Sequence, residues 1–210
     1  MKEVISYHRE EKLNALSHGL GSLLGVIGFF MLWQLHDPLT PLATLSVIIY
    51  SISIIVLFSA STLYHSVQSP GFKKKLRVLD HISIFTLIAG TYTPVALLTL
   101  IDGMGLTLFY TVWGIAFAGI LFKIFYTGKY EFISLLLYLA MGWLIVFDFQ
   151  SLWQQLSTTG IVLLFLGGAF YTIGIFFYAV KKIPYNHFIW HLFVLVGAIS
   201  HWFLIYYEVI

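Results

Sequence analysis

The stretch LATLSVIIYSISIIVLFSASTLYHS, residues 42–66, runs for its whole length without an Asp, Glu, Lys or Arg. An α-helix crosses a bilayer core about 30 Å thick with roughly 20 apolar residues, so this stretch is long enough to span a membrane. Six other stretches of the chain qualify in the same way. The seven predicted spans cover about residues 17–36, 42–66, 79–100, 104–125, 131–149, 159–180 and 186–208. The sequence therefore predicts an all-α integral membrane protein with seven transmembrane helices.

The composition supports this class and excludes others. Of the 210 residues, 60% are hydrophobic and only 10% are charged, whereas soluble domains carry about 25% charged residues. The formal net charge of +2 is too small to indicate a nucleic-acid partner. The absence of cysteine excludes disulfides and thiolate metal sites, so a metal ion would need His, Asp or Glu ligands. We expect one domain over residues 1–210, with a short cytoplasmic segment at 1–16 and no cleavable signal peptide.

The basic residues predict the orientation, because cytoplasmic loops carry an excess of Lys and Arg. The eleven are Lys2, Arg9, Lys12, Lys73, Lys74, Lys75, Arg77, Lys123, Lys129, Lys181 and Lys182. With seven spans, all of them fall at the N-terminus or in the loops after spans two, four and six. We therefore expect a cytoplasmic N-terminus and an external C-terminus.

This topology places four potential metal ligands at one depth, the cytoplasmic end of the bundle. His65 ends span two, Asp80 begins span three, and His187 and His191 lie in the first turns of span seven. Residues four apart share one helix face, so His187 and His191 project together, as do Ser61 and His65. Because these potential ligands come from distant parts of the sequence and meet at one depth, the sequence predicts a metal site.

Three imidazoles suit zinc, which accepts a tetrahedral arrangement of three protein ligands and a water. At this point Asp80 could be a fourth ligand or could hold the metal-bound water. Each residue also has a structural explanation. The two histidines of HFIWH could face headgroup water, Asp80 could cap its helix, and Ser61 could bond to its own helix backbone.

Other polar residues are less informative. Glu11, Asn14 and His18 lie on one face at the start of span one, where they could orient a ligand histidine, although a solvated helix start is the favoured interpretation. His81 points about 100° away from Asp80, and His201 lies roughly 15 Å along the helix from His191. Neither is expected to bind the same ion, and His201 is expected to be a hydrogen-bonded structural histidine.

At these residues the sequence resembles a known family. The motifs EEKLNALSHGLG, SASTLYHS, LDHISIFTLIAGTYTP and HFIWHLFVLVGAISHWF together resemble the hemolysin III family, the bacterial branch of the progestin and adipoQ receptor superfamily. The resemblance covers nearly the whole chain. It implies an adiponectin-receptor-like bundle of seven helices in the cell membrane of a bacterium. It also implies zinc bound by His65, His187 and His191, with Asp80 holding a zinc-bound water and Ser61 as the motif serine.

The implied function has alternatives. A more distant similarity to alkaline ceramidases favours a zinc-dependent hydrolase of a lipid acyl amide or ester, with catalytic roles for Asp80 and Ser61. A non-enzymatic, receptor-like or membrane-homeostasis protein with structural zinc is the alternative, and a pore-forming cytolysin is disfavoured because no polar stripe crosses the bilayer. Membrane lipids are the expected partners. The hormone binding of the animal receptors does not carry over, because this chain lacks their longer N-terminal region.

Overall fold

The computed structural model describes residues 2–210, with side chains from His8 onward, and the regular structure of this range is entirely helical. Its elements are α1 (Lys2–Leu35), α2 (Ala43–Ser66), α3 (Pro70–Pro94), a π-helical segment (Val95–Thr99), α4 (Gly105–Tyr126), α5 (Glu131–Trp143), a 3₁₀ segment (Leu144–Asp148), α6 (Phe149–Gln155), α7 (Thr158–Ala179) and α8 (Asn186–Glu208). Within the described range, seven helical stretches are long and apolar enough to cross a membrane. The predicted fold class is confirmed.

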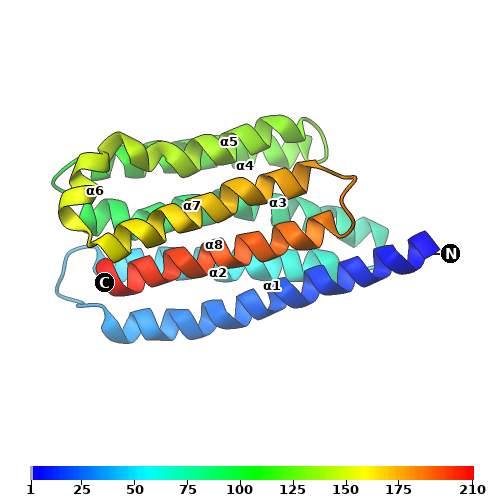
Figure 1. Cartoon of the computed structure of the whole chain (residues 1–210), viewed down its shortest axis with the longest axis horizontal. Helices are drawn as coiled ribbons and strands as arrows, with labels where there is room; N and C mark the ends of the chain where they lie inside the picture. The colour runs from blue at the N-terminus through cyan, green and yellow to red at the C-terminus, as the bar shows by residue number, and fades with distance from the viewer. Residues whose placement is uncertain (1) are drawn as a thin grey trace.

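The helices form a bundle in which neighbours in sequence pack side by side (Figure 1). α8 packs against both α1 and α7, and α5 packs against α3, α4 and α7. The bundle is thus closed, with the first and last helices in contact. The two chain ends lie at opposite ends of the bundle (Figure 1). We call the end that holds the start of α1 the N-terminal end.

Two helices begin earlier than the sequence suggests. α3 begins at Pro70, so the lysine run at 73–75 is helical. Only residues 67–69 separate α3 from α2. Proline at the first helical position is already set to the helical φ, and lysine is a good helix former, so the helix begins before the apolar residues do. α1 likewise includes the polar residues before the predicted start at residue 17. Hydropathy marks the membrane core and not the ends of the helices.

The fifth span is broken near its middle, which the sequence did not predict. α5 ends at Trp143, a 3₁₀ segment follows, and α6 occupies the predicted loop. Tyr92 of α3 joins the break, because its hydroxyl donates to the carbonyl of Gly142 at 3.0 Å and accepts from the backbone N–H of Ile145 at 2.9 Å. Backbone groups freed inside a membrane need such a partner. A tyrosine on a neighbouring helix therefore makes the irregular backbone possible.

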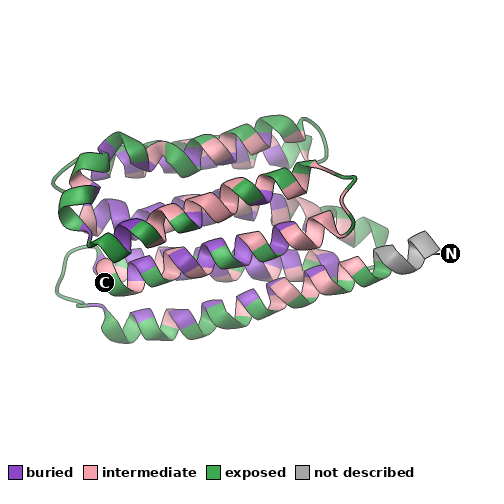
Figure 2. Ribbon diagram, in the orientation of Figure 1, coloured by how far each residue is buried: buried purple, intermediate pink, exposed green. Residues whose placement is uncertain are grey.

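The outer surface of the bundle is apolar, as contact with lipid requires. Figure 2 shows exposed residues on the outward faces of the helices and buried residues between them. The exposed side chains include Phe125, Phe132 and Phe147, each at least 70% exposed. In water such a surface would favour aggregation. In a bilayer it is the expected surface of a membrane protein.

Gly119 lets α4 approach α3 closely. A Cβ atom at this position would lie 2.3 Å from the buried Phe85 ring, whereas a Cβ at Gly114 of the same helix would meet nothing within 4 Å. We expect Gly119→Ala to destabilise the protein by about 1–3 kcal/mol, because a packed ring cannot move aside without strain. Gly114→Ala is the matched control and should be neutral or stabilising by up to about 1 kcal/mol. Unfolding in detergent measures both, and equal effects would refute the close packing.

Lys123 of α4 is fully buried, although the sequence placed it among the loop cations. Its Nζ donates to Glu131 at 2.6 Å, and Arg77 of α3 lies 3.7 Å from the same carboxylate. This ion pair joins α4 to the start of α5. Removing one partner leaves the other charge uncompensated, which typically costs about 3–5 kcal/mol.

Because Glu131→Gln leaves the buried Lys123 without its partner, it should lower the free energy of unfolding by about 3–5 kcal/mol. The double variant Lys123→Met/Glu131→Gln should recover most of the loss, because no charge is then left buried without a partner. Unfolding of both variants in the same detergent tests the pair. A double variant no more stable than Glu131→Gln would show that the ion pair is unimportant.

Candidate metal site

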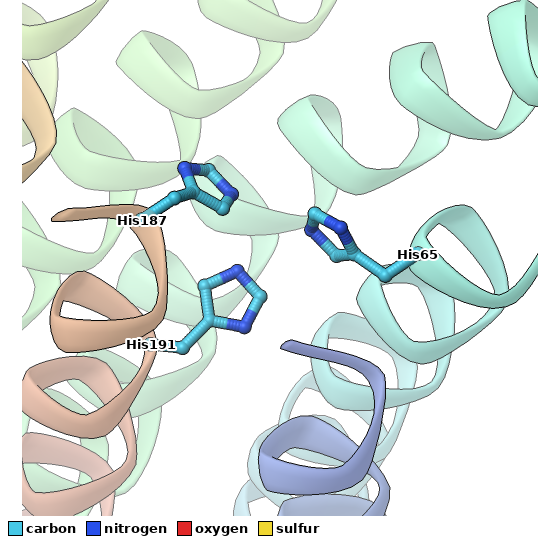
Figure 3. A group of neighbouring side chains, drawn as sticks. All are labelled: His65, His187 and His191. Atoms are coloured by element: carbon cyan, nitrogen blue, oxygen red, sulfur yellow. The ribbon is translucent and has the colours of Figure 1, made fainter. Parts of the chain in front are cut away.

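Three histidines from two distant helices meet at the N-terminal end of the bundle. His65 lies in the last turn of α2, and His187 and His191 lie in the first turns of α8. One potential ligand atom from each lies within 4.8 Å of the others. The ring centroids are 4.7 Å apart for His187 and His191, 4.9 Å for His65 and His191, and 5.2 Å for His65 and His187. Figure 3 shows the rings of the two α8 histidines facing that of His65.

Two ring nitrogens of this cluster have no hydrogen-bond partner in the described part of the chain. Nε2 of His65 and Nδ1 of His191 are buried and have no hydrogen-bond partner among the described side chains and backbone. Buried polar groups without partners are rare and call for an explanation. Three neutral imidazoles without a thiol are a typical zinc ligand set, and zinc would satisfy these nitrogens with bonds of about 2.0–2.1 Å. The residues present therefore fit a metal ion.

Asp80 and Ser61 lie beside the cluster. The Asp80 carboxylate lies within electrostatic range of His65, and the buried Ser61 hydroxyl has no hydrogen-bond partner among the described residues. Ser61 is buried one turn from His65 on α2, and Asp80 is partly exposed. Both side chains line the same internal cavity as His187 and His191. The structure thus brings together all five residues that the sequence singled out.

The cavity extends from the cluster into the middle of the bundle. Its volume is about 130 Å³, well above the roughly 10–15 Å³ that one water molecule needs on this measure. Tyr92 on α3 and His201 on α8 line its far part. His201 is ten residues beyond His191, so the cavity runs roughly 15 Å along the helices. Most of its wall between these ends is apolar, including Leu57, Leu87, Leu135, Leu139, Ile175 and Val194.

The start of α1 is part of the site, and the favoured expectation of a solvated helix face was wrong for its deeper residues. Asn14 and His18 are 1% and 3% exposed, and the His18 ring stacks on that of His191 with centroids 3.6 Å apart. Glu11 accepts a hydrogen bond from Nδ1 of His65 at 3.0 Å. Their three- and four-residue spacing signalled a shared face. Nothing in the spacing indicates that α8 and α2 cover that face.

His201 and His81 lie outside the three-histidine cluster, as predicted. The His201 ring donates through Nε2 to the carbonyl of Leu164 at 3.1 Å, which is the expected structural role. His81 lies near Glu131, with 3.8 Å between Nδ1 and the carboxylate, and both line the cavity. The sequence did not point to Glu131, because its ion pairs depend on α3, α4 and α5 coming together.

One cation outside the spans packs against Tyr178, a residue that lines the cavity. Lys181, in the loop before α8, places its ammonium 4.3 Å from the centre of the Tyr178 ring. Partial burial lowers the pKa of Lys181 below its ordinary value. The ring face stabilises the cation in part. This end of the bundle therefore combines charged and aromatic groups, as the edge of a membrane protein often does.

Comparison with known proteins identifies the relatives of this chain. The sequence profile described as Haemolysin-III related matches residues 6–202. The chain belongs to the hemolysin III family. It is 38% identical to Hemolysin-3 of Bacillus cereus, over 100% of this chain and 96% of that protein. It is 40% identical to the Hemolysin-3 homolog of Bacillus subtilis strain 168, over 94% and 93% of the two chains.

The similarity extends to an animal protein at lower identity. The human monocyte to macrophage differentiation factor is 29% identical over 94% of this chain and 83% of its own length. No solved structure gives a significant match. The resemblance seen in the sequence motifs is thus confirmed. Together with the seven apolar helices, the hemolysin III relatives make this a multi-pass bacterial membrane protein.

Proposed function

We propose that this hemolysin III protein is a zinc-dependent intramembrane hydrolase of a lipid acyl amide or ester. His65, His187 and His191 would hold the ion, Asp80 would be the general base, and Ser61 would stabilise the oxyanion. The observation that carries the proposal is the three-histidine cluster that opens onto an apolar cavity lined by a carboxylate and a hydroxyl. Three protein ligands leave a fourth zinc position open, which is typical of catalytic sites.

When bound, zinc would act as a Lewis acid that activates a water molecule and polarises a carbonyl. Asp80 lines the same cavity as His187 and His191, and it would accept the proton that the attacking water loses. The Ser61 hydroxyl would donate a hydrogen bond to the carbonyl oxygen as negative charge develops there. The polar groups at one end of the cavity would thus carry out the chemistry, and the apolar wall would bind the acyl chain of the lipid.

The shape of the cavity favours an acyl substrate. A chain bound along the wall between the cluster and His201 would lie in an apolar channel, with its carbonyl at the polar end. The predicted orientation puts that end at the cytoplasmic leaflet, so the headgroup would stay at the membrane surface. Burying the chain would provide most of the binding free energy, at about 25 cal/mol per Å².

One observation favours a structural role for zinc as the alternative. The cluster joins α2 to α8, two helices that are linked mainly through α1, which packs against both. An ion held by His65, His187 and His191 would tie them directly. In that case the protein would maintain or sense the state of the membrane without turning over lipid.

Lipid mass spectrometry separates these functions. Membranes of cells that produce the protein should lose one class of acyl lipid and gain the matching free fatty acid. An unchanged lipid profile in cells whose purified protein contains zinc would favour the structural alternative. Measuring zinc in the same preparation is essential, because without it an inactive, metal-free protein would give the same lipid result.

A further inference from the structure

One helix supplies a contact to each of the three clustered histidines. From α1, Glu11 bonds to Nδ1 of His65, and Glu10 accepts from the backbone N–H of His187 at 3.2 Å. His18 stacks on His191. Metal-ligand histidines usually depend on such partners for their orientation and tautomer. Among these contacts, only that of Glu11 reaches a ring nitrogen.

The bond to Glu11 determines which nitrogen of His65 is free. The side chains of His65 and Glu11 are 2% and 15% exposed, so water competes little with the bond. The other oxygen of the carboxylate accepts from the ammonium of Lys73, which marks it as ionised. An ionised carboxylate can only accept, so Nδ1 of His65 carries the hydrogen.

The second nitrogen then follows by elimination. Nε2 of His65 is buried and has no partner among the described residues. A hydrogen on Nε2 would be a buried donor without an acceptor, which is costly. Nε2 therefore presents a lone pair, and the three-histidine cluster contains a ligand atom of this ring.

We propose that Glu11 is a positioning residue for the metal site, with Lys73 as its counter-ion. The carboxylate holds His65 in the Nδ1–H tautomer and turns its Nε2 lone pair toward His187 and His191. The start of α1 and the start of α3 thus shape a site whose ligands lie on α2 and α8. The inference rests on the proposed metal site and does not depend on hydrolysis.

The test is the zinc affinity of the folded full-length protein, measured by competition with a chelator in nanodiscs. Glu11→Ala should weaken zinc binding by about 10- to 100-fold, the usual effect of losing such a partner. Glu11→Gln keeps an oxygen that can accept from Nδ1 but loses the ion pair with Lys73, so its loss should be smaller. Lys12→Ala, an exposed neighbour on the same helix, is the matched control and should leave the affinity unchanged.

A second readout separates positioning from general stability. Cobalt in place of zinc should give an altered visible absorption spectrum in Glu11→Ala, because the orientation of one ligand ring changes. Unchanged affinity and spectrum in Glu11→Ala would overturn the inference, whatever the thermal stability of the metal-free variant. If the wild-type protein binds no zinc, the metal site itself is wrong and this inference fails with it. Zinc binding by the wild type with no effect of Glu11→Ala overturns the inference alone.

Discussion

Asp80→Asn should lower lipid turnover by at least about 100-fold while one zinc ion per chain stays bound. A positioned general base typically contributes about 10²- to 10⁴-fold to the rate. Asn is nearly the same size as Asp and can still hydrogen bond, but it cannot accept a proton from water. The three histidines are unchanged in this variant, so the metal should remain.

The measurement is fatty acid release by purified wild type and Asp80→Asn in nanodiscs, with zinc determined on the same samples. Asp37→Asn is a suitable control, because it changes a fully exposed carboxylate of the α1–α2 loop. Undiminished release by Asp80→Asn would refute the catalytic role of this residue. Loss of zinc would instead make Asp80 a ligand, which is the other role that the sequence left open.

His191→Ala should weaken zinc binding on the order of 100-fold or more. A structural zinc site with four protein ligands contributes about 10–16 kcal/mol, so one ligand accounts for roughly 2.5–4 kcal/mol. His191 is 2% exposed and one of the three histidines whose potential ligand atoms lie within 4.8 Å of one another, so its loss leaves two of them. The substitution also leaves the stacked ring of His18 without its neighbour.

His201→Gln is the control for this variant. It changes a histidine of the same helix that lies outside the cluster and bonds to a backbone carbonyl. Zinc content and chelator competition should show a loss in His191→Ala and wild-type behaviour in His201→Gln. Equal zinc content in His191→Ala and the wild type would mean that the ion binds elsewhere.

The sequence predicted the parts of the molecule that depend on regular spacing. Seven apolar stretches predicted seven spans, and the i, i+4 spacing of His187 and His191 put both rings on one face of α8. Once the spans were aligned, His65 had to lie at the same end of the bundle. These inferences need only helix geometry and the thickness of a bilayer.

The features that the sequence missed depend on contacts between helices. The break after Trp143 is stabilised by Tyr92, which is about 50 residues away. Lys123 is buried because Glu131 lies opposite it, and nothing in its own segment indicates that partner. His18 and Asn14 are polar residues at the edge of an apolar run, where hydropathy cannot distinguish lipid, water and protein as neighbours. In each case the observed structure depends on packing between helices, which the local sequence does not show.

The most direct test of the central proposal is the dependence of hydrolysis on zinc in the purified protein. Wild-type protein in nanodiscs of defined acyl amides and esters is stripped of metal by a chelator and then reloaded with one zinc ion per chain. We expect fatty acid release to cease on stripping and to return on reloading, in the wild type and in Lys12→Ala but not in His191→Ala. Protein that carries one zinc ion per chain at the three histidines and still releases no fatty acid from either class of lipid would contradict the proposal.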